Sequence, residues 1–481
     1  MRLFNLRRRP WRSPQFSQYV AAPHPSVAPP LDPQFRPFVS ASAHFRSVAQ
    51  DSGAPEPLAI AIERDRGQVS VHRTMLQPSS TVADRVNLRH LERLVKMLLW
   101  QWGGWRVWIC GPEELGQAIA QTYSPTGPRA FDADFMGTVY GERFTVEALP
   151  LEKTPEPSES RAAVGGHLNG CRIGFDAGAS DHKVAAVIDG EAVFSEEVLW
   201  NPKDEANPEY HREHIRGALR RAASQMPRVD AIGVSSAGVY VDNRVRVASL
   251  FRGVPRDRFE AEVAGIYLDL ASEMGSVPIE VRNDGDVTAL AGAFTLEAGN
   301  VLGIALGSSE AAGYVDAHGR ITGWLNELAF APIDLDPEAP EDEWSGDRGC
   351  GVQYLSQVGA IRLAESAGLD LALGESPAEK LKMLQVLHAN NHRVAELVYQ
   401  SLGAYLGYAI AHYADYYEID HVLTLGRVTS GQGGQVMREW AERVLKVEFP
   451  QLSERITIHL PDDYSRRVGQ AVAAASLPEA P

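Results

Sequence analysis

Short apolar runs that end in small or polar residues recur through the second half of the chain. The stretches CRIGF, VDAIGV, VPIEV and VLGIAL each have the pattern of a buried strand. KVAAVIDGEAVF is predicted to contain a second strand that ends at Asp189-Gly190, and AAGYVDAHGRI a return strand after a turn of small residues. NDGDVTALAGAF, at 283–294, predicts a helix of small residues that begins as soon as a strand ends. The second half is therefore predicted to be an α/β structure.

The same patterns predict a smaller α/β domain over residues 56–150. PLAIAIERDRGQVSVHRTML has two strands around a turn at Asp65 to Gly67, and NLRHLERLVKMLLWQWGGW has the period of a helix. RVWICG is predicted to be a strand, PEELGQAIAQTY a helix, and RAFDADFMGTVYGERFTVEAL further strand. Residues 151–169, rich in Pro, Ser, Glu and Gly, are predicted to be a linker. We find no catalytic or ligand-binding motif in the smaller domain, and its role stays open.

Residues 1–55 are predicted to be a flexible arm. The first 49 residues contain seven Arg and eight Pro against the single acid Asp32. Pro10 and Pro14 interrupt the apolar run that a signal peptide needs. We expect the arm to lie on an acidic body or partner.

Composition narrows the class of protein further. A chain of 481 residues with 44% hydrophobic and 22% charged residues suits two or three globular domains. The net charge of −16 disfavours binding to nucleic acid, and we find no apolar run that approaches the length of a membrane span. Three scattered cysteines supply neither a disulfide framework nor a CxxC knuckle. We expect a cytoplasmic protein.

Candidate chemistry is concentrated at predicted strand ends. Asp176 ends one strand and is followed by the small residues 177–180, and a similar turn of small residues lies at 307–309. Such turns let backbone N–H groups approach a phosphate, and an Asp beside them can hold a divalent cation. Asn283 and Asp284 lie between the two turns in the sequence. Phosphoryl transfer requires this combination: amide donors and a metal on the phosphate, and a carboxylate near the acceptor hydroxyl.

The order of these segments from about residue 170 to 476 resembles the ROK family (repressor, ORF, sugar kinase) of the actin-like and sugar-kinase superfamily. DAGAS at 176–180 is similar to the family's first phosphate motif, and Asn283-Asp284 is similar to its Asn-Asp pair. GWLNELAF places Glu327 where the family has a ligand to sugar hydroxyls. HVLTLGRVTSGQGG resembles the nucleoside segment, and RRVGQAVAAASLP resembles the closing helix.

The resemblance implies an ATP-dependent sugar kinase with two ribonuclease-H-like lobes, one over 170–300 with 463–478 and one over 301–462. Asp284 would be the catalytic base, Asn283 and Glu327 would bind the sugar, and Asp176 would hold Mg²⁺. The residues that would contact ATP and its magnesium are Asp176, Gly178, Ser180, Gly307, Ser308, Ser309, Gly426 and Gly431. A homodimer is permitted, and an amino sugar is the second choice of substrate.

The family's zinc site is not expected in this chain. Phe330 stands at the position of a metal-binding His, and Glu343 and Ser345 stand at two positions of Cys. Cys350 alone cannot supply the four ligands of a structural zinc ion.

Other departures keep a second class of function open. Ser309 and Glu310 add bulk and charge where phosphates would lie, and Arg427 replaces a glycine of the nucleoside segment. These changes motivate the alternative of a non-catalytic protein that senses a sugar or nucleotide or acts as a scaffold. A DNA-binding repressor is disfavoured by the acidic charge.

Several of these residues also have a purely structural interpretation. Asp284 could be a helix cap, and Asp286 could be the base in its place. His211 and His214 are predicted to lie on a solvated helix face, and HYADYYEIDH, with His412, is predicted to cover a core.

Overall fold

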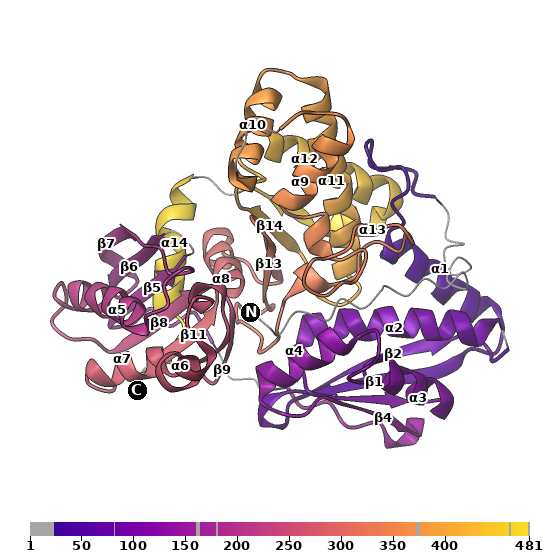
Figure 1. Cartoon of the computed structure of the whole chain (residues 1–481), viewed down its shortest axis with the longest axis horizontal. Helices are drawn as coiled ribbons and strands as arrows, with labels where there is room; N and C mark the ends of the chain where they lie inside the picture. Colours follow the sequence, from indigo (N-terminus) through magenta and orange to yellow (C-terminus); the bar gives the residue numbers. More distant parts are fainter. Residues whose placement is uncertain are drawn as a thin grey trace.

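The computed structural model describes residues 24–80, 82–159, 164–178, 181–371, 376–460 and 463–479, with backbone alone for 463–468. It contains an N-terminal domain and two further units, here called the first lobe (β5 to α8, with α14) and the second lobe (β12 to β15). Figure 1 shows the N-terminal domain lying alongside both lobes. In the described part of the chain, we find no helix with the length and apolar character of a membrane span.

The N-terminal domain is a four-stranded sheet of order β2-β1-β3-β4 with three helices. Its elements are β1 (Glu56–Glu63), η2 (Asp65–Gly67), β2 (Val69–Leu76), α2 (Ala83–Trp102), β3 (Arg106–Cys110), α3 (Glu113–Thr122), α4 (Ala130–Tyr140), β4 (Thr145–Leu149) and η3 (Leu151–Lys153). β1 is antiparallel to β2 and β3, and β3 is parallel to β4. The expected hairpin, helix, strand and helix over 56–122 are confirmed.

The strand expected over the first part of RAFDADFMGTVYGERFTVEAL is wrong, because that segment forms α4. The buried positions of α4, Asp132, Ala133, Met136 and Val139, are spaced i, i+1, i+4 and i+7, as on one face of a helix. The segment ends at Gly141 in the left-handed conformation that commonly terminates helices.

The expected flexible arm is wrong for residues 24–51, and residues 1–23 lie outside the described part of the chain. α1 (Phe38–Asp51) packs between the N-terminal domain and the second lobe. Phe45 stacks on His90 of α2 with the ring centroids 3.9 Å apart, and Phe38 meets His412 of α11 (Arg393–Tyr413) edge-on at 4.9 Å. Burial of these aromatic rings offsets the conformational entropy of the basic, proline-rich segment.

The first lobe is built on a five-stranded sheet of order β11-β8-β5-β6-β7. Its elements are β5 (Cys171–Ala177), β6 (Asp181–Ile188), β7 (Glu191–Leu199), α5 (Pro208–Ala223), β8 (Ala231–Ser236), β9 (Val239–Val241), β10 (Arg244–Val247), η4 (Ser249–Phe251), α6 (Arg256–Arg258), η5 (Phe259–Val263), α7 (Ile266–Glu273), β11 (Ile279–Asn283), α8 (Asp284–Leu296) and α14 (Asp463–Ala475). β5, β8 and β11 are parallel, so their carboxyl ends meet at one edge of the sheet.

The last helix, α14, returns to the first lobe and packs on β5, β8 and α8. Gly233 of β8 makes this approach possible, because a Cβ there would collide with the carbonyl oxygen of Ala474. α8 also packs on β12 and β13, so it connects the two lobes.

The second lobe is built on a four-stranded sheet of order β13-β12-β14-β15. Its elements are β12 (Val301–Leu306), β13 (Glu310–Val315), η6 (Leu328–Phe330), η7 (Gly351–Gln353), α9 (Gln357–Ser366), α10 (Pro377–Ala389), α11 (Arg393–Tyr413), β14 (His421–Leu425), α12 (Gln432–Glu448), α13 (Pro450–Arg455) and β15 (Thr457–His459). β12 is antiparallel to β13 and parallel to β14, as β5 is antiparallel to β6 and parallel to β8.

Candidate functional site

Asn283 and Asp284 lie where β11 ends and α8 begins. The side chain of Asn283 caps the helix, because its Oδ1 accepts from the Gly285 N–H at 2.7 Å while its Nδ2 donates to the Gly238 carbonyl at 2.7 Å. Asp284 is the first residue of α8 and is half-buried. Because Asn283 caps the helix, the Asp284 carboxylate is not required for capping. Its Oδ1 accepts a hydrogen bond from the Gly285 N–H at 3.1 Å.

Asp176 lies on the same edge of the sheet, near the end of β5. The register of the sheet pairs Asp176 with Ser235 of β8 and pairs Asn283 with the adjacent Ser236. Ser235 Oγ donates to Asp176 Oδ1 at 2.7 Å, and the Asp176 side chain is almost fully buried. The carboxyl ends of three parallel strands therefore gather Asp176, Asn283 and Asp284 together.

Glu327 reaches this group from the second lobe, on the segment that follows Trp324. Its neighbour Asn326 donates from Nδ2 to Asp286 Oδ1 at 2.9 Å and accepts at Oδ1 from Tyr417 at 2.9 Å. Asn326 has a positive φ of 53°, a conformation that Asn tolerates better than most residues. This bridge holds the segment against the first turn of α8.

Burial and mutual repulsion raise the pKa of every carboxyl in this group. Burial, with the charge of Asp176, raises the pKa of Asp284 to about 6, and burial raises that of Asp176 itself. Burial raises the pKa of Asp286 to about 7, and burial with the charges of Asp284 and Asp286 raises that of Glu327 to about 8. Carboxyl groups that influence one another in this way lie close in space.

The second sheet contributes a similar edge of strand ends. Gly307 follows β12 and Gly426 follows β14, and the Val428 N–H donates to the Leu306 carbonyl at 3.1 Å. Gly426 has a φ of 102° and lies so close to Leu306 that a Cβ would collide with its backbone. Only glycine fits there.

Glu310 links this second edge to the cluster of acidic side chains around Asp284, because it interacts electrostatically with Glu327. It directly follows the turn at 307–309, its Oε1 accepts from Tyr413 at 3.0 Å, and its Oε2 is buried without a hydrogen-bond partner. Burial, with the charge of Glu327, raises the pKa of Glu310 to about 8. Glu310 is therefore a neutral acid near pH 7, so the charge expected beside the phosphates is absent at that pH.

The remaining residues predicted for ATP that the structure describes lie around these edges. The Gly178 carbonyl accepts from the Trp200 indole at 2.9 Å, and Ser180 lies outside the described residues. Ser308 and Ser309 are exposed at the tip of their turn, and Gly431 is exposed at the start of α12.

We find no group of three or more His, Cys, Asp or Glu side chains arranged for a metal ion within the described ranges. Phe330, which stands where the resemblance would place a metal-binding His, stacks on Trp100 with the ring centroids 4.2 Å apart. Ser345 donates to Asp342 at 2.6 Å, and Cys350 is buried next to Asp347. Asp176 is one buried carboxylate, which suits Mg²⁺ that takes its other ligands from water and phosphate.

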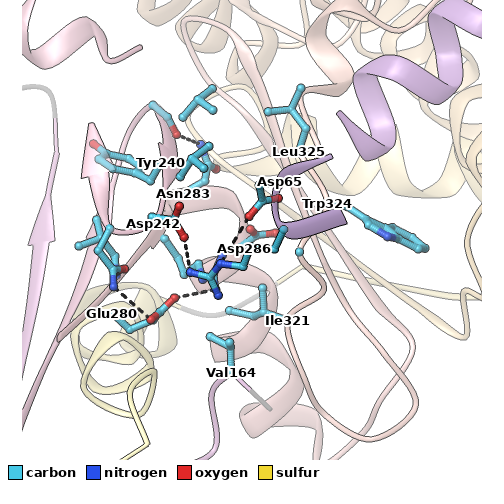
Figure 2. Close-up of a pocket in the computed structure, with 18 of the residues that line it drawn as sticks. Asp65, Val164, Tyr240, Asp242, Glu280, Asn283, Asp286, Ile321, Trp324 and Leu325 are labelled. Carbon is cyan, nitrogen blue, oxygen red and sulfur yellow. Dashed lines mark hydrogen bonds and ion pairs between the residues drawn. The ribbon is translucent and has the colours of Figure 1, made fainter. Parts of the chain in front are cut away.

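A pocket of about 200 Å³ is lined by Asn283 and Asp286 but not by Asp284. All three parts of the chain line it: Asp65 and Arg66 come from the tip of the β1–β2 hairpin, Tyr240 from the first lobe and Trp324 from the second. Figure 2 shows Asp65 facing Asp242 and Asn283 across this pocket. Arg66 pairs with Asp242 at the tip of the β9–β10 hairpin. The N-terminal domain thus forms a wall of the pocket.

Two histidine predictions have different outcomes. His211 is buried rather than solvated, with Nε2 near the carbonyls of Pro202 and Leu250 at 3.0 and 3.1 Å, because α5 packs that face against the loop before α6. His214 contacts His182, with 3.4 Å between Nδ1 of His214 and Nε2 of His182. The prediction that His412 covers a core is confirmed.

Sequence reasoning missed residues that connect distant segments. Ser235 and Asn326 were not singled out, and their contacts join positions 59 and 40 residues apart. The only local signal was the placement of Asn326 beside Glu327, in a sharp turn.

Comparison with known proteins gives a match at the level of fold. No family model and no curated protein sequence matches the chain. Among solved structures, the ROK hexokinase from Thermus thermophilus shares 18% identity with a TM-score of 0.50, over 64% of this chain and 97% of that chain. Over that 64% of its length, the chain has the fold of the ROK hexokinase.

Two other ROK structures are similar to this chain, with slightly lower TM-scores. A ROK family glucokinase from Streptomyces griseus, solved with glucose and AMPPNP, shares 20% identity with a TM-score of 0.49, over 64% of this chain and 99% of that chain. A ROK family transcriptional regulator, a homolog of the E. coli MLC protein, shares 19% identity with a TM-score of 0.48, over 64% and 79%.

Proposed function

We propose that the chain is a ROK-like carbohydrate kinase that transfers the γ-phosphoryl group of ATP to a sugar hydroxyl. The observation that carries this proposal is the meeting of Asp176, Asp284 and Glu327, which come from three distant segments of the chain. The fold of a ROK hexokinase supports the same class of reaction. We assign the first and second lobes to the two ribonuclease-H-like lobes of a sugar kinase, over 170–300 with 463–478 and over 301–462.

Asp284 accepts the proton of the attacking hydroxyl in this proposal. Its pKa of about 6 leaves it ionised near pH 7 yet more basic than an ordinary Asp, which favours proton transfer. The hydroxyl oxygen then bonds to the γ-phosphorus as the bond to the bridging oxygen of ADP breaks. The product is a sugar phosphate.

Asn283 and Glu327 hold the sugar. Glu327, with a pKa of about 8, is protonated near pH 7 and can donate a hydrogen bond to a sugar oxygen. The turn at 307–309 and the glycines Gly426 and Gly431 hold the nucleotide. Asp176 binds Mg²⁺, which neutralises charge on the phosphates when bound. Closure of the lobes excludes water and limits hydrolysis of ATP.

A non-catalytic sensor or scaffold is the second candidate. The observation that favours it is the packing of the N-terminal domain on both lobes, through Arg66 on Asp242 and Phe330 on Trp100. A domain that holds both lobes would restrict the closure that turnover needs.

Product analysis separates the two candidates. The full chain would be incubated with ATP, Mg²⁺ and a panel of hexoses and amino sugars, and sugar phosphate would be measured by mass spectrometry. A kinase forms sugar phosphate with at least one sugar. A sensor forms none, but a sugar or nucleotide still raises its melting temperature with the logarithm of ligand concentration.

A further inference from the structure

The segment that carries Glu327 is attached by its backbone to the C-terminal end of α2. Three consecutive N–H groups donate to three consecutive carbonyls of the last turn of that helix: Leu325 to Trp102 at 3.2 Å, Asn326 to Gln101 at 2.9 Å and Glu327 to Trp100 at 2.9 Å. Carbonyls in the last turn of a helix have no partner within the helix. α2 therefore gains the partners it lacks, and the backbone of Glu327 is fixed to another domain.

The same segment is also held by aromatic packing. Phe330, three residues after Glu327, stacks on Trp100 at 4.2 Å and lies 5.7 and 6.2 Å from Phe131 and Phe135 of α4. Trp100 is oriented in turn, because its indole donates to Asp132 at 2.6 Å. Aromatic pairs at these distances stabilise by more than their buried area alone.

A buried ionic cluster holds the neighbouring loop of the second lobe to α2 and the start of α4. Asp347 lies 2.9 Å from Arg93, 3.2 Å from Lys96 and 2.7 Å from Arg129. Against the effect of burial, the charges of Arg93 and Lys96 lower the pKa of Asp347 to about 2. The carboxylate is therefore ionised at any ordinary pH.

Backbone hydrogen bonds connect that loop to the Glu327 segment. The Ile333 N–H donates to the Gly349 carbonyl at 2.8 Å, and the Gly351 N–H donates to the Ala331 carbonyl at 2.9 Å. The loop of Asp347 and the segment of Glu327 thus form one unit, and α2 contacts this unit both at 325–327 and at Asp347.

We propose that α2 of the N-terminal domain is the positioning element of the acceptor site, and that Trp100 and Phe330 are positioning residues which set the place of Glu327. The inference rests on the proposed function for the role of Glu327 in sugar binding. It gives the N-terminal domain a part in the reaction through the segment that carries Glu327.

The test compares Phe330→Leu with Phe144→Leu. Both phenylalanines are half-buried against the core of the N-terminal domain, but Phe144 lies immediately before β4 and packs on Tyr123, whereas Phe330 packs on Trp100. Amide hydrogen exchange at 325–330 and the KM for the best sugar would be measured for each. Phe330→Tyr, which keeps the ring, is the conservative variant.

We expect Phe330→Leu to speed exchange at 325–327 and to raise the KM about tenfold with little change in kcat, since a small displacement of a substrate ligand is costly. Phe144→Leu lowers the melting temperature but leaves the exchange at 325–327 and the KM as in the wild type. Phe330→Tyr, which keeps the ring, also leaves both quantities at their wild-type values. Unchanged exchange at 325–327 in Phe330→Leu, or an unchanged KM, would overturn the proposal.

Wild-type exchange decides the question even if Phe330→Leu does not fold. The proposal requires the amides of 325–327 to be protected as well as the last turn of α2, and exchange at the rate of an open loop would contradict it. If the wild type phosphorylates no sugar, the proposed function fails, whereas the exchange measurement still decides whether α2 holds the segment.

Discussion

At the scale of single residues, neighbouring side chains around α8 have separate tasks. Asn283 caps the helix and Asp286 anchors the Glu327 segment through Asn326, whereas we propose that Asp284 keeps its carboxylate available to a substrate. The sequence showed the Asn-Asp pair and left capping and catalysis as alternatives for Asp284. It could not separate them, because the partners of Asn283 and Asp286 lie about 40 residues away along the chain.

We predict that Asp284→Asn lowers kcat for sugar phosphorylation by about 10²-fold or more, because the amide cannot accept the proton. Asp286→Asn is the matched control on the same turn of the helix. It weakens the contact with Asn326 and lowers stability, but retains most of kcat. Steady-state kinetics on both variants would show whether the loss follows Asp284 or Asp286, and the second result would reverse the assignment.

The pKa of Asp284 predicts a pH dependence of activity. A base is active when ionised, so kcat/KM should fall as the pH drops below about 6. It should fall again as the pH rises above about 8, because Glu327 then loses the proton that it donates to the sugar. A pH profile with a limb near 4, the range of an ordinary Asp, would contradict a buried base.

Glu310 predicts a pH dependence of stability. Its pKa is about 8 in the folded protein and near 4 when exposed, so its contribution to the free energy of unfolding is full below pH 4 and is lost as the pH rises through 8. Glu310→Gln cannot ionise, so its melting temperature should exceed that of the wild type by a margin that grows from pH 6 to pH 9. Exposed Glu338→Gln is the control and should show no such trend.

At the scale of elements, sequence patterns predicted the buried strands of both lobes and the hairpin of the N-terminal domain, because periodicity reports burial directly. The predictions for two elements were wrong, and the physical reason is the same for both. α4 was predicted as strand and α1 as part of a flexible arm, yet both bury aromatic and aliphatic side chains against partners that local patterns do not reveal. Tertiary packing decided their conformation.

The close contact of α14 with the first sheet predicts a strong effect of one methyl group. Gly233→Ala places a Cβ against the Ala474 carbonyl and should lower the free energy of unfolding by about 1–3 kcal/mol as α14 is displaced. Gly217→Ala, in α5, meets no backbone and should raise stability by up to about 1 kcal/mol. Urea denaturation of both variants measures the difference, and equal effects would argue against a tight seat for α14.

At the scale of the whole molecule, the N-terminal domain is part of the candidate site rather than an appendage. Its role could not be predicted, because the contacts that place it join residues as far apart as Arg93 and Asp347. The signal in the sequence was Phe330, an apolar residue at a position where the resemblance implies a metal ligand. The structure shows that its ring packs against α2 of the N-terminal domain.

The two ionic contacts of the N-terminal domain should differ in strength. Asp347→Asn leaves buried cations without their common partner and should cost about 3 kcal/mol or more. Asp242→Asn removes the exposed partner of Arg66 and should cost less than about 1 kcal/mol. Calorimetry would compare them, and a small effect of Asp347→Asn would show that the ionic cluster does not hold the domain.

The most direct test of the proposed kinase is a crystal structure of the full chain with a non-hydrolysable ATP analogue and the sugar that it phosphorylates best. The account predicts one sugar hydroxyl at about 2.6–3.2 Å from the Asp284 carboxylate, with the terminal phosphate beyond it and Glu327 on the sugar. A sugar that binds away from Asp284, or a triphosphate that cannot approach it, would contradict the account.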